Sequence, residues 1–137
     1  MILMNIYYLQ SIETPRLIIR PVKSGDEAVL NQAINRSLES LQRWIAWAVD
    51  PSLKATKDHI DRGVKSWQSG RATELPMIVI HKADNKIIAG SGFNERSVPV
   101  VPVYEIGYWL DVDYRGQGLV TELVIAITRY ALEAVGA

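Results

Sequence analysis

The sequence contains no cysteine, carries no net charge and has no hydrophobic run long enough to cross a membrane. Without cysteine, the chain can form neither a disulfide nor a thiolate metal site, and a cysteine nucleophile is excluded. Fifteen basic residues balance fifteen acidic ones and form no run, so a direct nucleic-acid partner is not expected. The N-terminal residues lack the basic flank and the length of a signal peptide. We therefore expect a soluble, cytoplasmic protein that binds neither nucleic acid nor membrane.

Histidine is also scarce. The two histidines, His59 and His81, stand alone, without a second ligand at the spacing that a zinc site needs. We expect no metal site and assign both side chains to surface or structural roles.

The order of the predicted elements indicates a single domain, residues 1–137, of the α+β class. Hydrophobic patterning predicts strands at 16–22, 75–81, 87–93 and 103–112, and helices at 24–35, 37–48, 55–69 and 118–135. The strands at 75–81 and 87–93 are close enough in the chain to form an antiparallel hairpin. Three strands follow one another without an intervening helix, which favours a mixed, mainly antiparallel sheet flanked by helices over an alternating βαβ fold.

Local signals refine these elements. Ser24 and Glu27 have the spacing of a capping box at the start of the helix 24–35. Gly90 and Gly92 in the strand 87–93 indicate a bulge or a close contact on that face. The residues expected to face the core are Ala28, Val29, Ala33 and Ile34, then Ile60, Val64 and Trp67, and finally Leu119, Leu123, Ile127 and Ala131.

The most informative stretch is residues 104–122, a hydrophobic strand that passes through a glycine-rich loop directly into a helix. Gly116 and Gly118 have no Cβ, so a bulky anion can approach the backbone there. The first N–H groups of the helix have no partner within the helix and lie at the positive end of its dipole. Arg115 adds a full positive charge. The pattern is typical of a phosphate site, although a purely steric glycine turn without a ligand is an alternative.

The loop Arg115-Gly116-Gln117-Gly118-Leu119-Val120 resembles the acetyl-coenzyme A loop of the GNAT N-acetyltransferase superfamily. Val120 departs from that pattern, which has glycine or alanine at the last position. Three more stretches resemble the RimJ/RimL-like branch in the same order along the chain: Glu13-Thr-Pro-Arg-Leu-Ile-Ile-Arg20, Leu41-Gln-Arg-Trp-Ile-Ala-Trp-Ala48 and Tyr104-Glu-Ile-Gly-Tyr-Trp109.

This resemblance implies a GNAT-like fold that lacks its C-terminal strands, with acetyl-CoA as the co-substrate. The residues implied in acetyl-CoA binding form two groups. The backbone around Leu110, Asp111 and Val112 would receive the acetyl-pantetheine arm, and residues 115–120 would hold the pyrophosphate. The strand 103–112 would form an open sheet edge, which invites homodimerisation.

The implied activity is direct transfer of an acetyl group to a primary amine, either a protein N-terminus or a small molecule, in a ternary complex. A protein N-terminal amine has a pKa of ~7.7–8.0, so much of it is neutral near pH 7, whereas a lysine amine at ~10.4 is almost fully charged. Glu105 is the best candidate for a catalytic base, because burial in its hydrophobic strand would make the carboxyl group more basic.

Other interpretations remain open at this stage. The chain is also consistent with an inactive, truncated GNAT fragment that serves as a CoA-binding or dimerisation module. Glu105 could equally be a structural carboxylate, Leu110 and Val112 ordinary core residues, and Arg115 a solvated charge. A dinucleotide site is disfavoured, because Thr121 stands where that motif has its third glycine.

Overall fold

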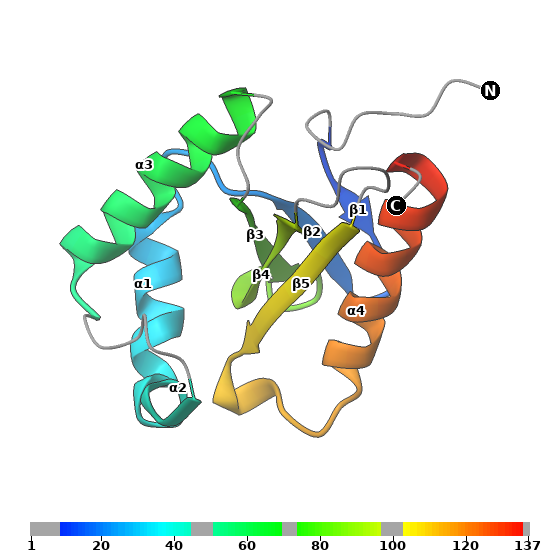
Figure 1. The fold of residues 1–137 in the computed structure, drawn as a ribbon. Helices are drawn as coiled ribbons and strands as arrows, with labels where there is room; N and C mark the ends of the chain where they lie inside the picture. Colours follow the sequence, from blue (N-terminus) through cyan, green and yellow to red (C-terminus); the bar gives the residue numbers. More distant parts are fainter. Residues whose placement is uncertain (1–8, 45–50, 70–73, 97–102, 136–137) are drawn as a thin grey trace.

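The computed structural model describes residues 9–44, 51–69, 74–96 and 103–135. Its centre is a five-stranded antiparallel sheet whose strands lie side by side in chain order, from β1 to β5. Helices α1 and α3 lie on one face of the sheet and helix α4 lies on the other (Figure 1). The predicted α+β class, with an antiparallel sheet flanked by helices, is confirmed.

The strands are β1 (Ile12–Glu13), β2 (Leu17–Pro21), β3 (Glu74–His81), β4 (Lys86–Arg96) and β5 (Val103–Leu110). The helices are α1 (Glu27–Arg36), α2 (Leu38–Trp44), α3 (Leu53–Ser69) and α4 (Leu119–Tyr130), with a 3₁₀ turn η3 (Val112–Tyr114) and a π-helical turn η4 (Ala131–Val135). Among the described residues, no helix combines the length and the apolar character that a membrane span requires.

The predicted hairpin is present as β3 and β4, joined by a turn in which Asn85 has a positive φ of 50°. Asparagine tolerates this left-handed conformation better than most residues. The register shifts between Val79 and Ile80, which pair with Ala89 and Ile87, so Ile88 is the extra residue of a bulge. The bulge therefore lies outside Gly90 and Gly92.

The first helix of the chain differs from its prediction. It begins at Glu27 after Asp26, so Ser24 is not the N-cap. The Asp26 carboxylate instead accepts hydrogen bonds from Arg20 at 2.8 and 2.9 Å, which fixes the turn before the helix. The Glu27 side chain folds back to accept from the Gly25 N–H at 3.0 Å.

The buried face of α1 is also rotated relative to the prediction. Ala28 and Val29 are exposed, whereas Leu30 is buried together with Ala33 and Ile34. Leu30, Ala33 and Ile34 have the i, i+3, i+4 spacing that lines one helix face. Contact with the sheet selected this face over the one that contains Val29.

The other predicted elements agree with the structure where it describes them. Ile60 and Trp67 of α3 are buried, with Val64 packed against the core. The buried face of α4 consists of Leu119, Leu123, Ile127 and Ala131, as predicted. The predicted helix 37–48 is observed as α2 up to Trp44, and its last four residues lie outside the described residues.

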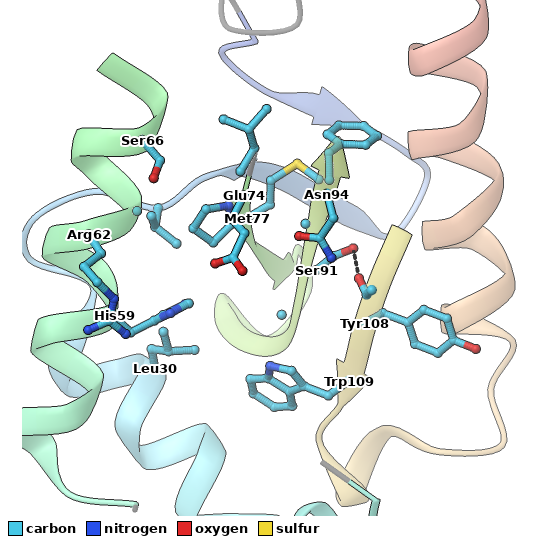
Figure 2. Close-up of a pocket in the computed structure, with 18 of the residues that line it drawn as sticks. Leu30, His59, Arg62, Ser66, Glu74, Met77, Ser91, Asn94, Tyr108 and Trp109 are labelled. Carbon is cyan, nitrogen blue, oxygen red and sulfur yellow. Dashed lines mark hydrogen bonds between the residues drawn. The ribbon is translucent and has the colours of Figure 1, made fainter. Parts of the chain in front are cut away.

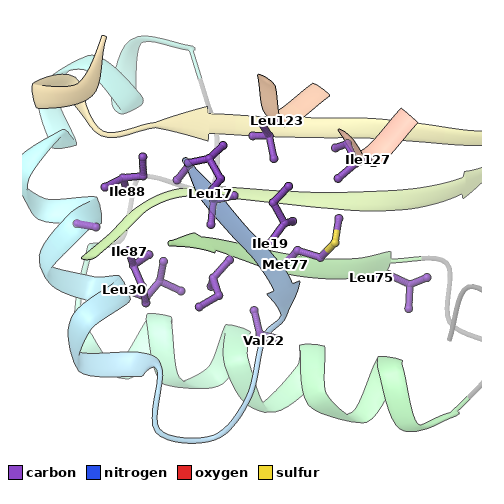
Figure 3. Close-up of a cluster of buried hydrophobic side chains, with 14 of the residues drawn as sticks. Leu17, Ile19, Val22, Leu30, Leu75, Met77, Ile87, Ile88, Leu123 and Ile127 are labelled. Atoms are coloured by element: carbon purple, nitrogen blue, oxygen red, sulfur yellow. The ribbon is translucent and has the colours of Figure 1, made fainter. Parts of the chain in front are cut away.

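The hydrophobic core fills both sides of the sheet (Figure 3). Leu123 and Ile127 of α4 face Leu17 and Ile19 of β2 across one side, while Leu30 of α1 packs on the opposite side. Strand β5 is the last strand in the sheet order, so within the described part of the chain its outer edge has no strand partner, as predicted.

Candidate active site

The glycine loop connects the end of β5 to the start of α4. Gly116 and Gly118 have φ angles of 77° and 76°, in the left-handed region that glycine adopts at little cost. Gly118 is the N-cap of α4, and no side chain caps the helix there. A Cβ added at Gly116 would meet nothing within 4 Å, so the space beside the backbone is open. The loop therefore combines exposed backbone, a free helix N-terminus and room for an anion.

Arg16 supports this loop from a distant part of the sequence. Its Nη1 donates to the Gln117 carbonyl at 2.8 Å, and its Nε donates to Glu122 at 2.8 Å. Thr14 donates to the same carboxylate at 2.5 Å. Burial would raise the pKa of Glu122, but the hydrogen bonds from Thr14 and Arg16, together with the Arg16 charge, outweigh it and lower that pKa. Sequence reasoning missed this cation, which lies next to the loop only because the turn between β1 and β2 packs against the start of α4.

Tyr114 anchors the start of the loop. Its side chain is buried, and its hydroxyl donates to Asp84 in the β3–β4 turn at 2.5 Å. The His81 ring lies at a centroid distance of 5.2 Å from the Tyr114 ring. The hydrogen bond to Asp84, followed by burial, raises the pKa of Tyr114 to about 12, so the hydroxyl stays protonated as a donor.

Asp111 ties the end of β5 to the junction between α1 and α2. Its carboxylate is fully buried and accepts from the Arg36 Nε at 2.8 Å and from the Asp113 N–H at 3.0 Å. The Val112 N–H donates to Ser37 Oγ at 2.8 Å, and the Asp111 N–H donates to the Ile88 carbonyl at 2.7 Å. The backbone N–H groups of Asp111 and Val112 are therefore already used inside the protein.

The other residues predicted to bind acetyl-CoA differ in how far they are buried. Arg115 is exposed and donates a hydrogen bond to Ser40 of α2. Leu119 is buried in the core, so it can face a ligand only with its backbone. Gln117 is exposed, and Val120 and Leu110 are partly buried. Their roles in acetyl-CoA binding stay predictions.

Glu105 is exposed on β5, contrary to the burial that we expected for it. It pairs in register with Asn94 of β4, and Asn94 pairs in turn with Glu74 of β3. Side chains in register on neighbouring strands share one face of the sheet, so the two carboxylates flank one amide. The assignment of Glu105 as a base stays a prediction, and Glu74 is a second candidate that sequence reasoning missed.

A pocket of about 580 Å³ lies between helices α1 and α3 and strands β3 to β5. Its volume is within the range of ~300–1,000 Å³ typical of ligand sites. Figure 2 shows Arg62 and His59 extending from α3, with the Glu74 carboxylate near the centre and Trp109 on the opposite side. Tyr108 points away from this group.

Glycines form part of the pocket floor. Gly92 of β4 and Gly107 of β5 are directly opposite each other in the sheet, and both line the pocket. The Trp109 indole lies over Gly90, where an added Cβ would be 2.3 Å from Nε1. The close contact predicted for this strand is thus confirmed at Gly90.

The cationic wall of the pocket comes from α3. His59 and Arg62 are three residues apart, which places them on the same helix face. Two effects lower the pKa of His59: desolvation by the surrounding protein, which is the larger, and the positive charge of Arg62. The negative charge of Glu74 raises that pKa. The imidazole is therefore mainly neutral near pH 7. The sequence shows the i, i+3 spacing of His59 and Arg62. It does not show that this helix face is directed towards the pocket formed with strands β3 to β5.

The model of the acetyltransferase (GNAT) domain family matches residues 16–137. The chain belongs to this family. The predicted GNAT resemblance is thereby confirmed.

Solved structures with the same fold include ribosomal-protein acetyltransferases of the predicted RimJ/RimL-like type. The ribosomal-protein-S5-alanine acetyltransferase of Vibrio fischeri is 20% identical, with a TM-score of 0.75, over 91% of this chain and 68% of that protein. The Salmonella typhimurium acetyltransferase that modifies the N-terminal serine of ribosomal protein L7/L12 is 22% identical, with a TM-score of 0.75, over 89% and 68%. RimJ of Mycobacterium smegmatis, solved with CoA-disulfide, is 17% identical, with a TM-score of 0.79, over 96% and 66%. The chain thus spans about two thirds of the length of these proteins.

Proposed function

We propose that this chain transfers the acetyl group of acetyl-CoA to the N-terminal amine of a protein, by direct attack in a ternary complex. The observation that carries the proposal is the glycine loop, which leaves the N-terminus of α4 open with Gly116 and Gly118 in left-handed conformations. Membership of the GNAT family and the RimJ- and RimL-type fold support the same activity.

The loop fits the pyrophosphate of acetyl-CoA. The backbone N–H groups from Gly116 onwards and the first turn of α4 offer donors, and no side chain of the described residues caps them. Two arginines lie at the loop: Arg115 is bound to Ser40, and Arg16 is bound to Gln117 and paired with Glu122. Because the Glu122 carboxylate offsets the Arg16 charge, Arg115 is the cation that would favour an anion at this loop.

The pocket is suited to the acceptor because it shares strand β5 with the loop. Residues Gly107 to Trp109 line the pocket, and the same strand leads through Leu110 into the glycine loop. An amine above Gly107 would therefore be near the region proposed for the acetyl-pantetheine arm. Acetyl-CoA supplies the thioester, the amine forms the new C–N bond, and the thiolate of CoA leaves.

A carboxylate would accept the proton that the amine loses. Glu105 is the predicted base, and Glu74 is the alternative because it lines the pocket. An N-terminal amine needs little assistance, since its pKa is ~7.7–8.0. Glu105→Gln and Glu74→Gln separate the two: the variant that lacks the base should lose activity where the carboxylate is ionised, and its pH profile should lose the acidic limb that protonation of the base produces. If neither variant changes the profile, no carboxylate of this pair acts as the base.

Calorimetric titration of the purified chain with acetyl-CoA tests the cofactor site. Arg115→Gln should weaken binding by about tenfold, the effect of one charge-assisted hydrogen bond. Gly118→Ala should weaken it as well, because alanine disfavours a φ of 76°. Arg129→Gln, at the other end of α4, removes the same charge away from the loop and should bind normally. The proposal would be contradicted if Arg115→Gln and Gly118→Ala bound acetyl-CoA as tightly as Arg129→Gln, or if the folded wild type did not bind it.

A further inference from the structure

The pocket contains an opening for which the protein itself gives no packing reason. Gly90 is explained by the Trp109 indole that lies on it, and at Gly92 a Cβ would approach the Leu75 carbonyl oxygen to 3.1 Å. At Gly107, by contrast, an added Cβ would meet nothing within 4 Å. The Gly107 backbone is therefore open on the side of the pocket, so a main chain can lie against the sheet there.

Arg62 lies on the wall opposite β5. It is exposed on α3 and forms no ion pair with any carboxylate in the described part of the chain. The nearby His59 is mainly neutral, so it adds no second positive charge beside Arg62. In Figure 2 the Arg62 side chain extends from α3 towards the pocket. Its charge is therefore available to a ligand.

The position of Arg62 determines how far from strand β5 it can bind a group of the ligand. Helix α3 packs over β3, because Gly63 lies against Pro76. Strand β3 is two strand spacings from β5, or about 10 Å. An extended peptide advances ~3.3–3.6 Å per residue. A chain whose amine lies at β5 therefore brings its third residue, to within about one position, to the α3 wall.

We propose that Arg62 recognises an acidic side chain at about the third residue of the acceptor polypeptide, whose first residues cross the glycine floor from β5 to α3. This inference rests on the proposed function, which places the acceptor amine at β5. It goes further by naming the acceptor class, an N-terminus followed closely by aspartate or glutamate.

Peptides that differ only in their third residue test the proposal. With glutamate, glutamine or lysine at that position, the wild type should favour glutamate over glutamine by about fivefold in kcat/KM and in affinity, as expected for one partly exposed ion pair. Lysine should be the least favoured. Glutamate moved to the tenth residue should give no advantage, because it lies beyond the reach of Arg62.

Variants on one helix attribute the effect to Arg62. Arg62→Gln should abolish the preference for glutamate, and Arg62→Glu should reverse it in favour of lysine. Lys65→Gln is the matched control, since Lys65 is an exposed cation of α3 that does not line the pocket, and it should keep the wild-type order. The reversal shows that Arg62→Glu is folded, because an unfolded protein gains no preference for lysine, and acetyl-CoA binding serves as the same check for Arg62→Gln.

Peptide affinities are measured by calorimetry without turnover, and acetyl-CoA affinity is measured on the same samples. The inference is overturned if the wild type binds the three peptides equally, or if Arg62→Gln keeps the preference for glutamate. Discrimination between peptides without acetyl-CoA binding would support the peptide site and contradict the proposed transfer. Normal acetyl-CoA binding without discrimination between the peptides would support the cofactor site and contradict the peptide site.

Discussion

Asp111→Ala should destabilise the protein more than its position beside a surface loop suggests. The Asp111 side chain is 0% exposed, and it holds the end of β5 against the junction of α1 and α2. Alanine removes the acceptor for the Arg36 Nε and for the Asp113 N–H, which are bound at 2.8 and 3.0 Å. Both donors would then depend on water that enters the space left by the carboxylate.

The magnitude follows from these two hydrogen bonds. The charge-assisted bond with Arg36 is worth ~1.5–3 kcal/mol. The bond to the Asp113 N–H resembles an N-cap and is worth about 1 kcal/mol. Arg36 is 32% exposed, so its guanidinium regains hydration in the variant, and the lower part of the range applies. We expect a loss of about 2.5 kcal/mol in the free energy of unfolding, against a typical total of ~5–15 kcal/mol.

Urea denaturation followed by circular dichroism measures this loss. Asp113→Asn, which changes an exposed carboxylate two residues away, is the control and should stay within ~0.5 kcal/mol of the wild type. A double-mutant cycle with Arg36→Gln should give a coupling of about 1.5 kcal/mol. A loss below about 1 kcal/mol for Asp111→Ala, or a coupling near zero, would refute this account of the buried pair.

Two pH effects follow from the residues around the loop. The hydrogen bond to Asp84 raises the pKa of Tyr114 from 10.0 to about 12, so its contribution to stability should be complete below pH 10 and disappear as the pH rises through about 12. Urea midpoints measured across that interval should fall in the wild type and change less in Tyr114→Phe. The lowered pKa of Glu122 has the opposite sign: its contribution is present above the ordinary pKa of 4.5 and is lost as the pH falls through the lowered value. Thermal melts at decreasing pH should show this loss in the wild type, and an equal loss in Glu122→Gln would exclude its contacts with Arg16 and Thr14 as the cause.

The sequence determined most of the secondary structure because the relevant signals are local. The apolar face of α4, from Leu119 to Ala131, follows a helical period, and the run at β3 is typical of a buried strand. The glycine loop was recognisable because Gly116 and Gly118 allow left-handed turns directly before a helix. The two-residue strand β1 was missed, since so short a segment has no periodicity to detect.

Only the tertiary structure decided which side chains meet across the sheet and around the loop. The sequence could not place Arg16 beside Gln117 or Asp111 beside Arg36, because these pairs are joined by packing between elements far apart in the chain. The burial expected for Glu105 was wrong for the same reason, since its strand lies at the end of the sheet. Local periodicity therefore determined the elements and the loop, and long-range packing determined the charges that surround the pocket.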